Sequence, residues 1–246
     1  MSHKTVELER LATSDDKYFR GGEFYGKQFP LKFEVKIHPT SSGIIVVNYP
    51  GYNGDIDGYN NKYGAQADFI QEQNLGSVVR SGNHHWAGFE FDQSTQDDLK
   101  HIVDYSIKNA REICGSEDPS IYLMGFSAGA SAIAAIAHEY TQIPKILLMA
   151  PSGDAGQEAV TEGLKKFGGE VYIAIGENDD VVGPEAGKKF YDMATGASLR
   201  ELVMIPNCDH QFRGEVNGRI MSKSPFWAFG GDKTFPSPEG GMKLYD

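Results

Sequence analysis

Cysteine is scarce in this sequence: Cys114 and Cys208 are the only two among 246 residues. Two cysteines cannot supply the disulfide framework of a small secreted domain, and no Cys-x-x-Cys or Cys/His spacing of a metal site occurs. We therefore expect two buried or incidental thiols, no metal site and no cofactor.

Basic residues are outnumbered, since 23 Lys and Arg stand against 34 Asp and Glu for a net charge of −11. This excess of negative charge would repel a nucleic acid, so we expect no nucleic-acid partner. Long apolar runs are missing as well. The least charged run, residues 121–137, is interrupted by glycine and serine, and the first ten residues lack the apolar core of a secretory signal. These absences predict a cytoplasmic protein with no membrane partner.

The residues that are present are typical of a globular protein, with 40% hydrophobic and 23% charged side chains. Such a chain can bury a sizeable core, and its length suits one generous domain. No internal repeat, low-complexity tract or linker interrupts it. We therefore expect a single domain over residues 1–246.

Strand and helix patterns alternate along the chain. Apolar runs predict buried strands at residues 44–47, 77–80, 121–124, 145–150, 171–175 and 202–205, and alternation predicts a half-exposed antiparallel strand at 31–37 near a sheet edge. Helical spacing and end signals predict helices at about 62–73, 94–113, 127–140, 157–167 and 184–194. Strands that alternate with helices predict an α/β fold, in which helices cover both faces of a mostly parallel sheet.

One motif carries a specific chemical meaning, the G-x-S-x-G sequence Gly125-Phe-Ser-Ala-Gly129. An apolar strand runs directly into it and an alanine-rich helix leaves it, which is the setting of a nucleophile elbow. Such a turn would expose the Ser127 hydroxyl at the carboxyl edge of the sheet and at a helix N-terminus, which favours developing negative charge. We therefore expect Ser127 to be a catalytic nucleophile.

Two further strands end in residues that would complete a catalytic triad. The strand at 171–175 is followed by Asp179 and Asp180, and the strand at 202–205 is followed by Asp209 and His210. A serine hydroxyl becomes a useful nucleophile when an imidazole takes its proton, and a carboxylate orients that imidazole. Because parallel strands end at one edge of a sheet, these side chains should meet near Ser127.

With these residues the chain resembles the α/β-hydrolase family over roughly residues 30–215. The matching segments are Gly125–Gly129, residues 175–182 and residues 207–212. The resemblance implies a Ser127, Asp179 and His210 triad, because the family's acid usually follows the strand-ending glycine by three residues. It also implies an oxyanion hole made by the backbone N–H groups of Ala128 and, by position, Tyr52.

Between the strands at 145–150 and 171–175 there is room for one short helix and no cap domain. We therefore expect an open site that hydrolyses a small-molecule carboxylic ester or thioester through an acyl-serine, as a carboxylesterase does. The triad alone leaves open a peptidase or amidase and an acyltransferase. A non-catalytic binding protein on the same fold is a further alternative.

Other residues carry weaker signals. Phe126, His84 and His85 are expected to border the substrate pocket. Residues Asn53 to Gly64 partly match an EF-hand calcium loop but lack its acidic first and twelfth residues. Residues 183–188 partly match a phosphate-binding loop but have the wrong spacing. We interpret both segments as turns.

The last 36 residues, 211–246, begin with a short helix and turn irregular and aromatic-rich from Ser224 onward. Phe226, Trp227, Phe229, Phe235 and Tyr245 make this tail too aromatic for a typical disordered segment. We expect it to pack on its own domain or across a subunit contact in a homo-oligomer.

Overall fold

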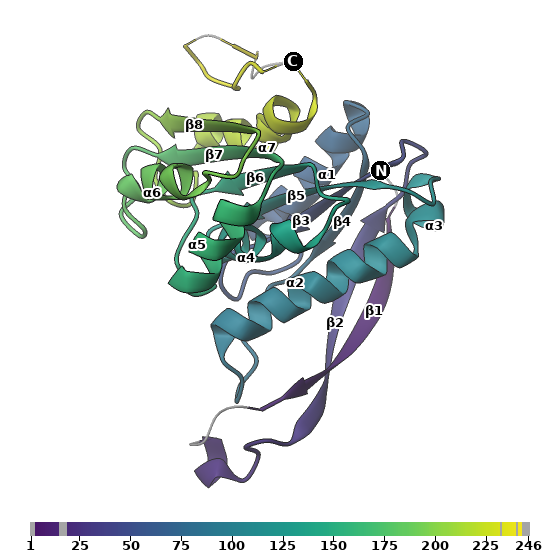
Figure 1. Cartoon of the computed structure of the whole chain (residues 1–246). Coiled ribbons are helices and arrows are strands. Elements are labelled where there is room, and N and C mark those ends of the chain that lie inside the picture. Colours follow the sequence, from purple (N-terminus) through teal and green to yellow (C-terminus); the bar gives the residue numbers. More distant parts are fainter. Residues whose placement is uncertain (1–2, 15–18, 232, 240, 243–246) are drawn as a thin grey trace.

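The computed structural model describes residues 3–14, 19–231, 233–239 and 241–242. In these residues eight strands form one sheet, in the order β1-β2-β4-β3-β5-β6-β7-β8 (Figure 1). The strands are β1 (Lys4–Thr13), β2 (Gln28–His38), β3 (Ile44–Tyr49), β4 (Ser77–Ser81), β5 (Ser120–Phe126), β6 (Lys145–Met149), β7 (Glu170–Gly176) and β8 (Leu199–Ile205). The β1–β2 and β2–β4 pairs are antiparallel and the other neighbouring pairs are parallel, so the mostly parallel sheet is confirmed.

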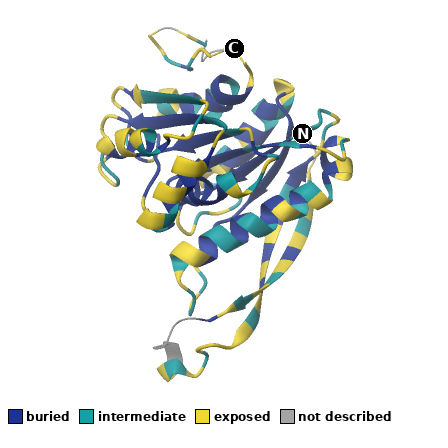
Figure 2. Ribbon diagram, viewed as in Figure 1, coloured by how far each residue is buried: buried dark blue, intermediate teal, exposed yellow. Residues whose placement is uncertain are grey.

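Helices cover both faces of the sheet, as the alternating pattern predicts. The α-helices are α1 (Lys62–Glu72), α2 (Phe91–Lys108), α3 (Ala110–Cys114), α4 (Ala128–Ile136), α5 (Gln157–Lys166), α6 (Glu185–Met193) and α7 (Glu215–Phe229), and the 3-10 turns are η1 (Phe19–Gly22), η2 (Tyr59–Asn61) and η3 (Ala137–Glu139). Apolar side chains of α2 to α5 form one buried cluster with the sheet, those of α1 and α7 form another on the opposite face, and α6 contributes to both. Figure 2 shows the central strands buried between these two layers.

The expected helix at 94–113 is two helices in the structure. It begins earlier, at Phe91, and breaks at Asn109, which has non-helical backbone angles and donates from Nδ2 to the carbonyl oxygen of Tyr105 at 2.8 Å. Asparagine competes for helix carbonyls in this way, which explains the break.

The strand β1 is not among the strands expected from the sequence. It forms the edge of the sheet, so β2, expected near an edge, is the second strand. Residues 28–34 of β2 pair with β1 alone, because β4 joins β2 from Val35 onward. This part of β1 and β2 therefore extends beyond the other six strands as an arm (Figure 1). Alternation of Val6 and Leu8 with glutamates was the available signal for β1.

The expectation of an irregular tail from Ser224 is wrong for residues 224–229, since α7 continues through Pro225 to Phe229, whereas the described residues from Gly230 onward are irregular. Proline lacks the N–H that would bond the carbonyl oxygen four residues earlier, that of Met221. In the structure Gln66 Nε2 of α1 donates to this oxygen at 2.9 Å. A side chain distant in sequence therefore replaces the missing helical donor and lets the helix continue.

The aromatic residues of the tail pack on the protein's own sheet. Trp227 and Phe229 are buried, and their rings lie 5.0 Å from those of Tyr172 and Tyr122. Phe226 is half-buried, and the ring of Phe235 lies 5.0 Å from that of Trp227. Packing of these residues on their own domain, one of the two expected arrangements, is confirmed, whereas Tyr245 lies outside the described residues.

The segment between β6 and β7 contains α5 and is described throughout, so it holds no cap domain. None of the helices in the described ranges is both long and apolar enough to cross a bilayer.

Candidate active site

Ser127 occupies a strained turn between β5 and α4. Its backbone angles are φ 53° and ψ −119°, a combination that residues with a side chain rarely adopt. Hydrogen bonds hold the turn: Ser127 N–H donates to the Met149 carbonyl oxygen at 2.9 Å, and Ser131 N–H donates to that of Ser127 at 3.1 Å. The hydroxyl is thus presented between the end of β5 and the first turn of α4.

Two glycines are required on either side of Ser127. A Cβ atom on Gly125 would lie 2.7 Å from the Ala130 nitrogen, and one on Gly129 would lie 2.2 Å from the Tyr49 carbonyl oxygen. Both distances are shorter than atoms tolerate, so any side chain would push α4 away from β5 or β3. This explains the motif's glycines by close approach rather than by backbone angle.

The three residues predicted to form a triad meet at the carboxyl edge of the sheet. His210 Nε2 lies 3.2 Å from Ser127 Oγ, and His210 Nδ1 lies 2.8 Å from Asp179 Oδ2. All three are buried, with 8% exposure for Ser127 and 3% for each of the others. Because a carboxylate oxygen accepts a hydrogen bond, the Nδ1 atom carries the proton and Nε2 is left to accept from the serine hydroxyl.

Asp179 differs in its contacts from the other two aspartates near the ends of these strands, Asp180 and Asp209. Asp179 Oδ1 accepts hydrogen bonds from the N–H groups of Val181 at 3.1 Å and Val182 at 3.0 Å, which orients the carboxylate toward His210. Asp180 is exposed. Asp209 accepts a hydrogen bond from the Arg213 N–H at 2.9 Å and pairs with its guanidinium, so it is engaged elsewhere.

The loop after β3 runs beside Ser127. A Cβ atom on Gly51 would lie 3.2 Å from the Cβ of Ser127, so this glycine is in close contact with the elbow. In the part of the chain that the structure describes, the N–H groups of Gly51, Tyr52 and Ala128 donate no hydrogen bond. Unpaired N–H groups next to a serine hydroxyl are the donors that an oxyanion needs.

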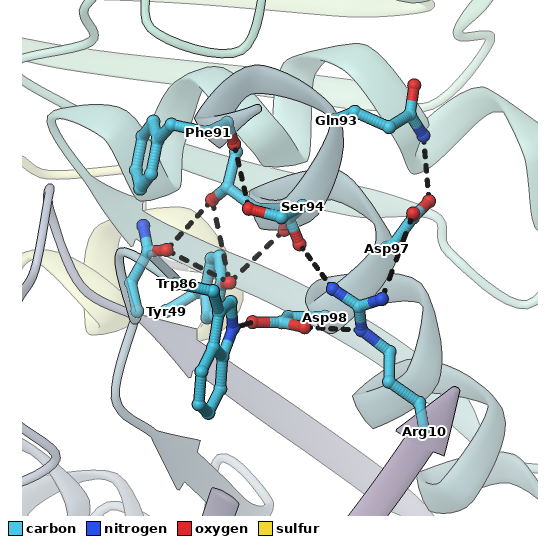
Figure 3. A network of polar contacts seen from close by, with 10 residues as sticks. Arg10, Tyr49, Trp86, Phe91, Gln93, Ser94, Asp97 and Asp98 are labelled. Atoms are coloured by element: carbon cyan, nitrogen blue, oxygen red, sulfur yellow. Dashed lines mark hydrogen bonds and ion pairs between the residues drawn. The ribbon is translucent and has the colours of Figure 1, made fainter. Parts of the chain in front are cut away.

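A buried network supports this loop and connects it to the β1 arm. Tyr49 Oη donates to the Thr95 carbonyl oxygen at 3.1 Å, at the start of α2. Further along the same helix, Asp98 accepts from Trp86 Nε1 at 2.8 Å and from Arg10 Nε of β1 at 2.5 Å (Figure 3). Burial raises the pKa of the Asp98 carboxyl, which Arg10 partly offsets. The network therefore ties the arm, α2 and the loop into one unit.

The residues expected to border the pocket have different surroundings. The buried ring of Phe126 lies 5.0 Å from that of His210. His85 Nδ1 lies 2.8 Å from Tyr52 Oη, and the Tyr52 ring lies 4.5 Å from that of Phe91. His84 stacks on Trp86 at 5.0 Å and lines a cavity that does not include Ser127. Phe126 thus contacts His210 and His85 contacts Tyr52 of the loop after β3, whereas His84 lines a separate cavity together with Asn53 and Gly54.

A cavity of about 380 Å³ opens at Ser127, between the segment after β6 and helix α6. Residues 151–154 and Val182 form its walls, and Asp154 and Lys189 give it charges of both signs. Its size suits a small ligand group.

Cys208 lies two residues before His210, but its thiol is a poor nucleophile. Burial, with Asp209 and Asp179 nearby, raises the pKa of its thiol to about 12, so the reactive thiolate is disfavoured. In the described residues no group of three or more His, Cys, Asp or Glu side chains could hold a metal ion. Asp57, in the segment that echoes a calcium loop, instead pairs with Arg80 and Lys36.

Two residues of the site were missed by sequence reasoning. Lys62 was assigned only to a helix, yet its ammonium nitrogen lies 4.6 Å from the centre of the Phe126 ring. Asn83 was not singled out, yet it is fully buried and donates from Nδ2 to the Pro50 carbonyl oxygen at 3.1 Å. The one signal in the sequence was the position of Asn83 just after a strand that ends at the same sheet edge.

No family model and no curated protein sequence matches the chain. Solved structures do. A dienelactone hydrolase from Anabaena variabilis is 14% identical, with a TM-score of 0.64 over 91% of this chain and 99% of that one. The esterase domain of a Rhodothermus marinus protein is 14% identical, with a TM-score of 0.64 over 90% and 95%. A Pyrococcus furiosus esterase is 17% identical, with a TM-score of 0.62 over 92% and 94%. Together with the strand order, these similarities show that the chain has the α/β-hydrolase fold.

Proposed function

We propose that this protein hydrolyses a small carboxylic ester or thioester through an acyl-Ser127 intermediate. The observation that carries the proposal is the pair of contacts that joins Ser127 Oγ to His210 Nε2 at 3.2 Å and His210 Nδ1 to Asp179 at 2.8 Å. The structural neighbours named as esterases and as a hydrolase support the same class of reaction, at low sequence identity.

In the first half of the reaction, Ser127 Oγ attacks the ester carbonyl carbon while His210 Nε2 accepts the hydroxyl proton. The carbonyl oxygen becomes an oxyanion, which the N–H groups of Tyr52 and Ala128 stabilise. The C–O bond to the alcohol, or the C–S bond to the thiol of a thioester, then breaks, and His210 gives its proton to the departing oxygen or sulfur. Asp179 keeps the imidazole in the required tautomer and stabilises its cation.

In the second half, water attacks the acyl-Ser127 carbonyl and His210 Nε2 accepts its proton. Collapse of this second tetrahedral intermediate breaks the bond to Ser127 Oγ, which recovers the proton from His210. The products are an alcohol or thiol and a carboxylic acid. The cavity of about 380 Å³ at Ser127 and the absence of a cap between β6 and β7 favour small substrates.

Labelling with a fluorophosphonate probe, combined with a panel of p-nitrophenyl esters of increasing acyl length, tests this proposal. Wild-type protein should be labelled and should release p-nitrophenol, and Ser127→Ala should lose both properties, with turnover reduced by several orders of magnitude. Ser152→Ala is the matched control, because it removes another hydroxyl of the same cavity and should still be labelled.

Near-normal turnover by Ser127→Ala would overturn the proposal. Matched p-nitroanilides and added alcohol or amine acceptors extend the panel. Faster cleavage of the anilides than of the esters would identify the protein as an amidase. Transfer of the acyl group mainly to the added acceptor would identify it as an acyltransferase.

A further inference from the structure

A second cavity, of about 740 Å³, lies beside α1 and α7. Its walls include Lys62 and Gln66 of α1 and the three residues that directly follow His210, namely Gln211, Phe212 and Arg213. The cavity is therefore built partly from the loop that carries the catalytic imidazole.

The charge of this cavity is one-sided. Lys62 and Arg213 contribute positive charge, and none of the residues that line it is an aspartate or glutamate. Arg213 is largely exposed and pairs with Asp209, Nε to Oδ2 3.5 Å apart. Lys62 has no carboxylate partner among the described residues, in a protein whose net charge is −11.

The surroundings of Lys62 are aromatic. Its Nζ atom lies 4.6 Å from the centre of the Phe126 ring and 5.0 Å from that of Tyr63. Burial lowers the pKa of Lys62, which means that its ammonium lacks part of the stabilisation that water would give. Ring contacts restore some of this stabilisation, and a bound anion would restore more.

Phe126 connects this ammonium to the reacting atoms. One ring contact joins Phe126 to Lys62, and another, at 5.0 Å, joins it to the His210 imidazole. Phe126 also immediately precedes Ser127 in the elbow. The two contacts place Lys62 Nζ no more than about 9.6 Å from the centre of the His210 ring, a separation that a substrate chain of several bonds can span. The cavity at Ser127 itself does not offer this selectivity, because it holds both Asp154 and Lys189.

We propose that Lys62 binds a carboxylate carried by the substrate, so that the preferred substrates are esters with a free carboxylate a few bonds from the ester group. This inference rests on the proposed ester hydrolysis and names its substrate class. Arg213 stands at the same cavity and adds to its positive potential. Lys62 is thus a specificity residue that contacts substrate at a distance from the bond that breaks.

The test compares an anionic ester with a neutral ester of the same length. In the first pair, mono-p-nitrophenyl adipate carries a carboxylate on the acyl side and p-nitrophenyl hexanoate carries none. In the second pair, 4-acetoxybenzoate carries a carboxylate on the leaving group and 4-acetoxybenzamide carries a neutral amide there. The readout is the ratio of kcat/KM for the anionic ester to that for its neutral partner, in wild type, Lys62→Met, Lys62→Arg and Lys165→Met. Lys165 is exposed in the last turn of α5 and is not part of this cavity. Lys165→Met therefore changes the net charge by the same amount as Lys62→Met.

We expect the ratio to fall about ten- to a hundredfold in Lys62→Met for at least one pair, as loss of a hydrogen bond to a charged group generally causes. Lys62→Arg should recover part of the ratio, and Lys165→Met should keep it. A ratio in Lys62→Met equal to that of wild type for both pairs would overturn the assignment of Lys62 while leaving Ser127-dependent hydrolysis of neutral esters intact. Absence of both labelling and hydrolysis in wild type would overturn the proposed function, and this assignment with it.

Discussion

Asn83 donates a hydrogen bond from Nδ2 to the Pro50 carbonyl oxygen at 3.1 Å. Its backbone N–H donates to the Gly54 carbonyl oxygen at 2.9 Å, so Asn83 contacts the loop after β3 at two points. Its Oδ1 atom accepts from Thr95 Oγ1 at 2.9 Å and lies 3.2 Å from Tyr49 Oη. Gly51 and Tyr52 lie between Pro50 and Gly54, whose carbonyl oxygens accept these bonds. Asn83 therefore positions the segment that we propose to bind the oxyanion.

Replacing Asn83 by Leu should therefore lower kcat more than it raises KM. We expect a loss of about ten- to a hundredfold in kcat, since small misplacements of catalytic groups carry costs of this order. Steady-state kinetics on a p-nitrophenyl ester measure the split. Thr95→Val is the control, because it removes one partner of Asn83 Oδ1 but leaves the bond to Pro50, so it should lower Tm with little effect on kcat. Equal kcat losses in the two variants would remove the positioning role.

Asp179→Asn should reduce kcat by roughly 10⁴, by analogy with other triads, because an amide in place of the carboxylate stabilises the wrong imidazole tautomer. Asp180→Asn removes the same charge one residue later, from an exposed side chain, and should cost far less. Kinetics of the two variants under identical conditions make the comparison. The reverse ranking would show that Asp179 is not the acid of the triad.

The strain at Ser127 predicts an unusual ranking of stabilities. Glycine normally destabilises a protein relative to alanine by roughly 0.4–1 kcal/mol, but relief of backbone strain of about 1–3 kcal/mol should offset this loss at φ 53°. Ser127→Gly should therefore melt at or above the Tm of Ser127→Ala. At Ser131, inside α4, the usual order should hold, with glycine below alanine. A Ser127→Gly variant clearly less stable than Ser127→Ala would argue against the strain.

His38 predicts a loss of stability in acid. Arg80 Nε donates to His38 Nε2 at 3.0 Å, and burial, followed by the charge of Arg80, lowers the pKa of His38 from its usual 6.5 to about 4. Between these values the unfolded chain binds more protons than the folded one, so the free energy of unfolding falls as pH drops from about 6.5 to about 4.

His38→Gln keeps an acceptor for Arg80 and removes the titration, so its unfolding free energy should depend less on pH within this window. Urea unfolding at several pH values measures the difference between the two proteins. An identical pH dependence would show that His38 does not contribute.

Gln66 and Pro225 should be coupled through the Met221 carbonyl oxygen. Gln66→Met leaves this oxygen without a donor and should destabilise the protein by about 1–3 kcal/mol. Pro225→Ala supplies a helical N–H for the same oxygen, so the double variant should lose less stability than the two single effects together predict. Denaturant unfolding of all four proteins gives the coupling, and additive effects would contradict it.

Local sequence determined much of the fold. Apolar runs predicted β3 to β8 and helical spacing predicted α1, α2, α4, α5 and α6, because these patterns reflect burial of a strand or of one helix face. The elbow was also predictable, since Gly125 and Gly129 are demanded by contacts within a few residues of Ser127 or with the strand beside it. The placement of Asp179 and His210 after neighbouring parallel strands followed from the same pattern.

Tertiary structure decided what depends on residues far apart in the sequence. The apolar alternation of β1 is short, because Arg10 takes the next position on the face of Val6 and Leu8, and the place of β1 at the edge follows only from its pairing with β2. The continuation of α7 past Pro225 needs Gln66, which lies 155 residues earlier. Lys62, at the start of α1, reaches the ring of Phe126 at the end of β5, a contact between residues 64 positions apart that depends on how the fold places α1. A sequence pattern records which side of an element is buried, whereas these contacts depend on which elements the sheet brings together.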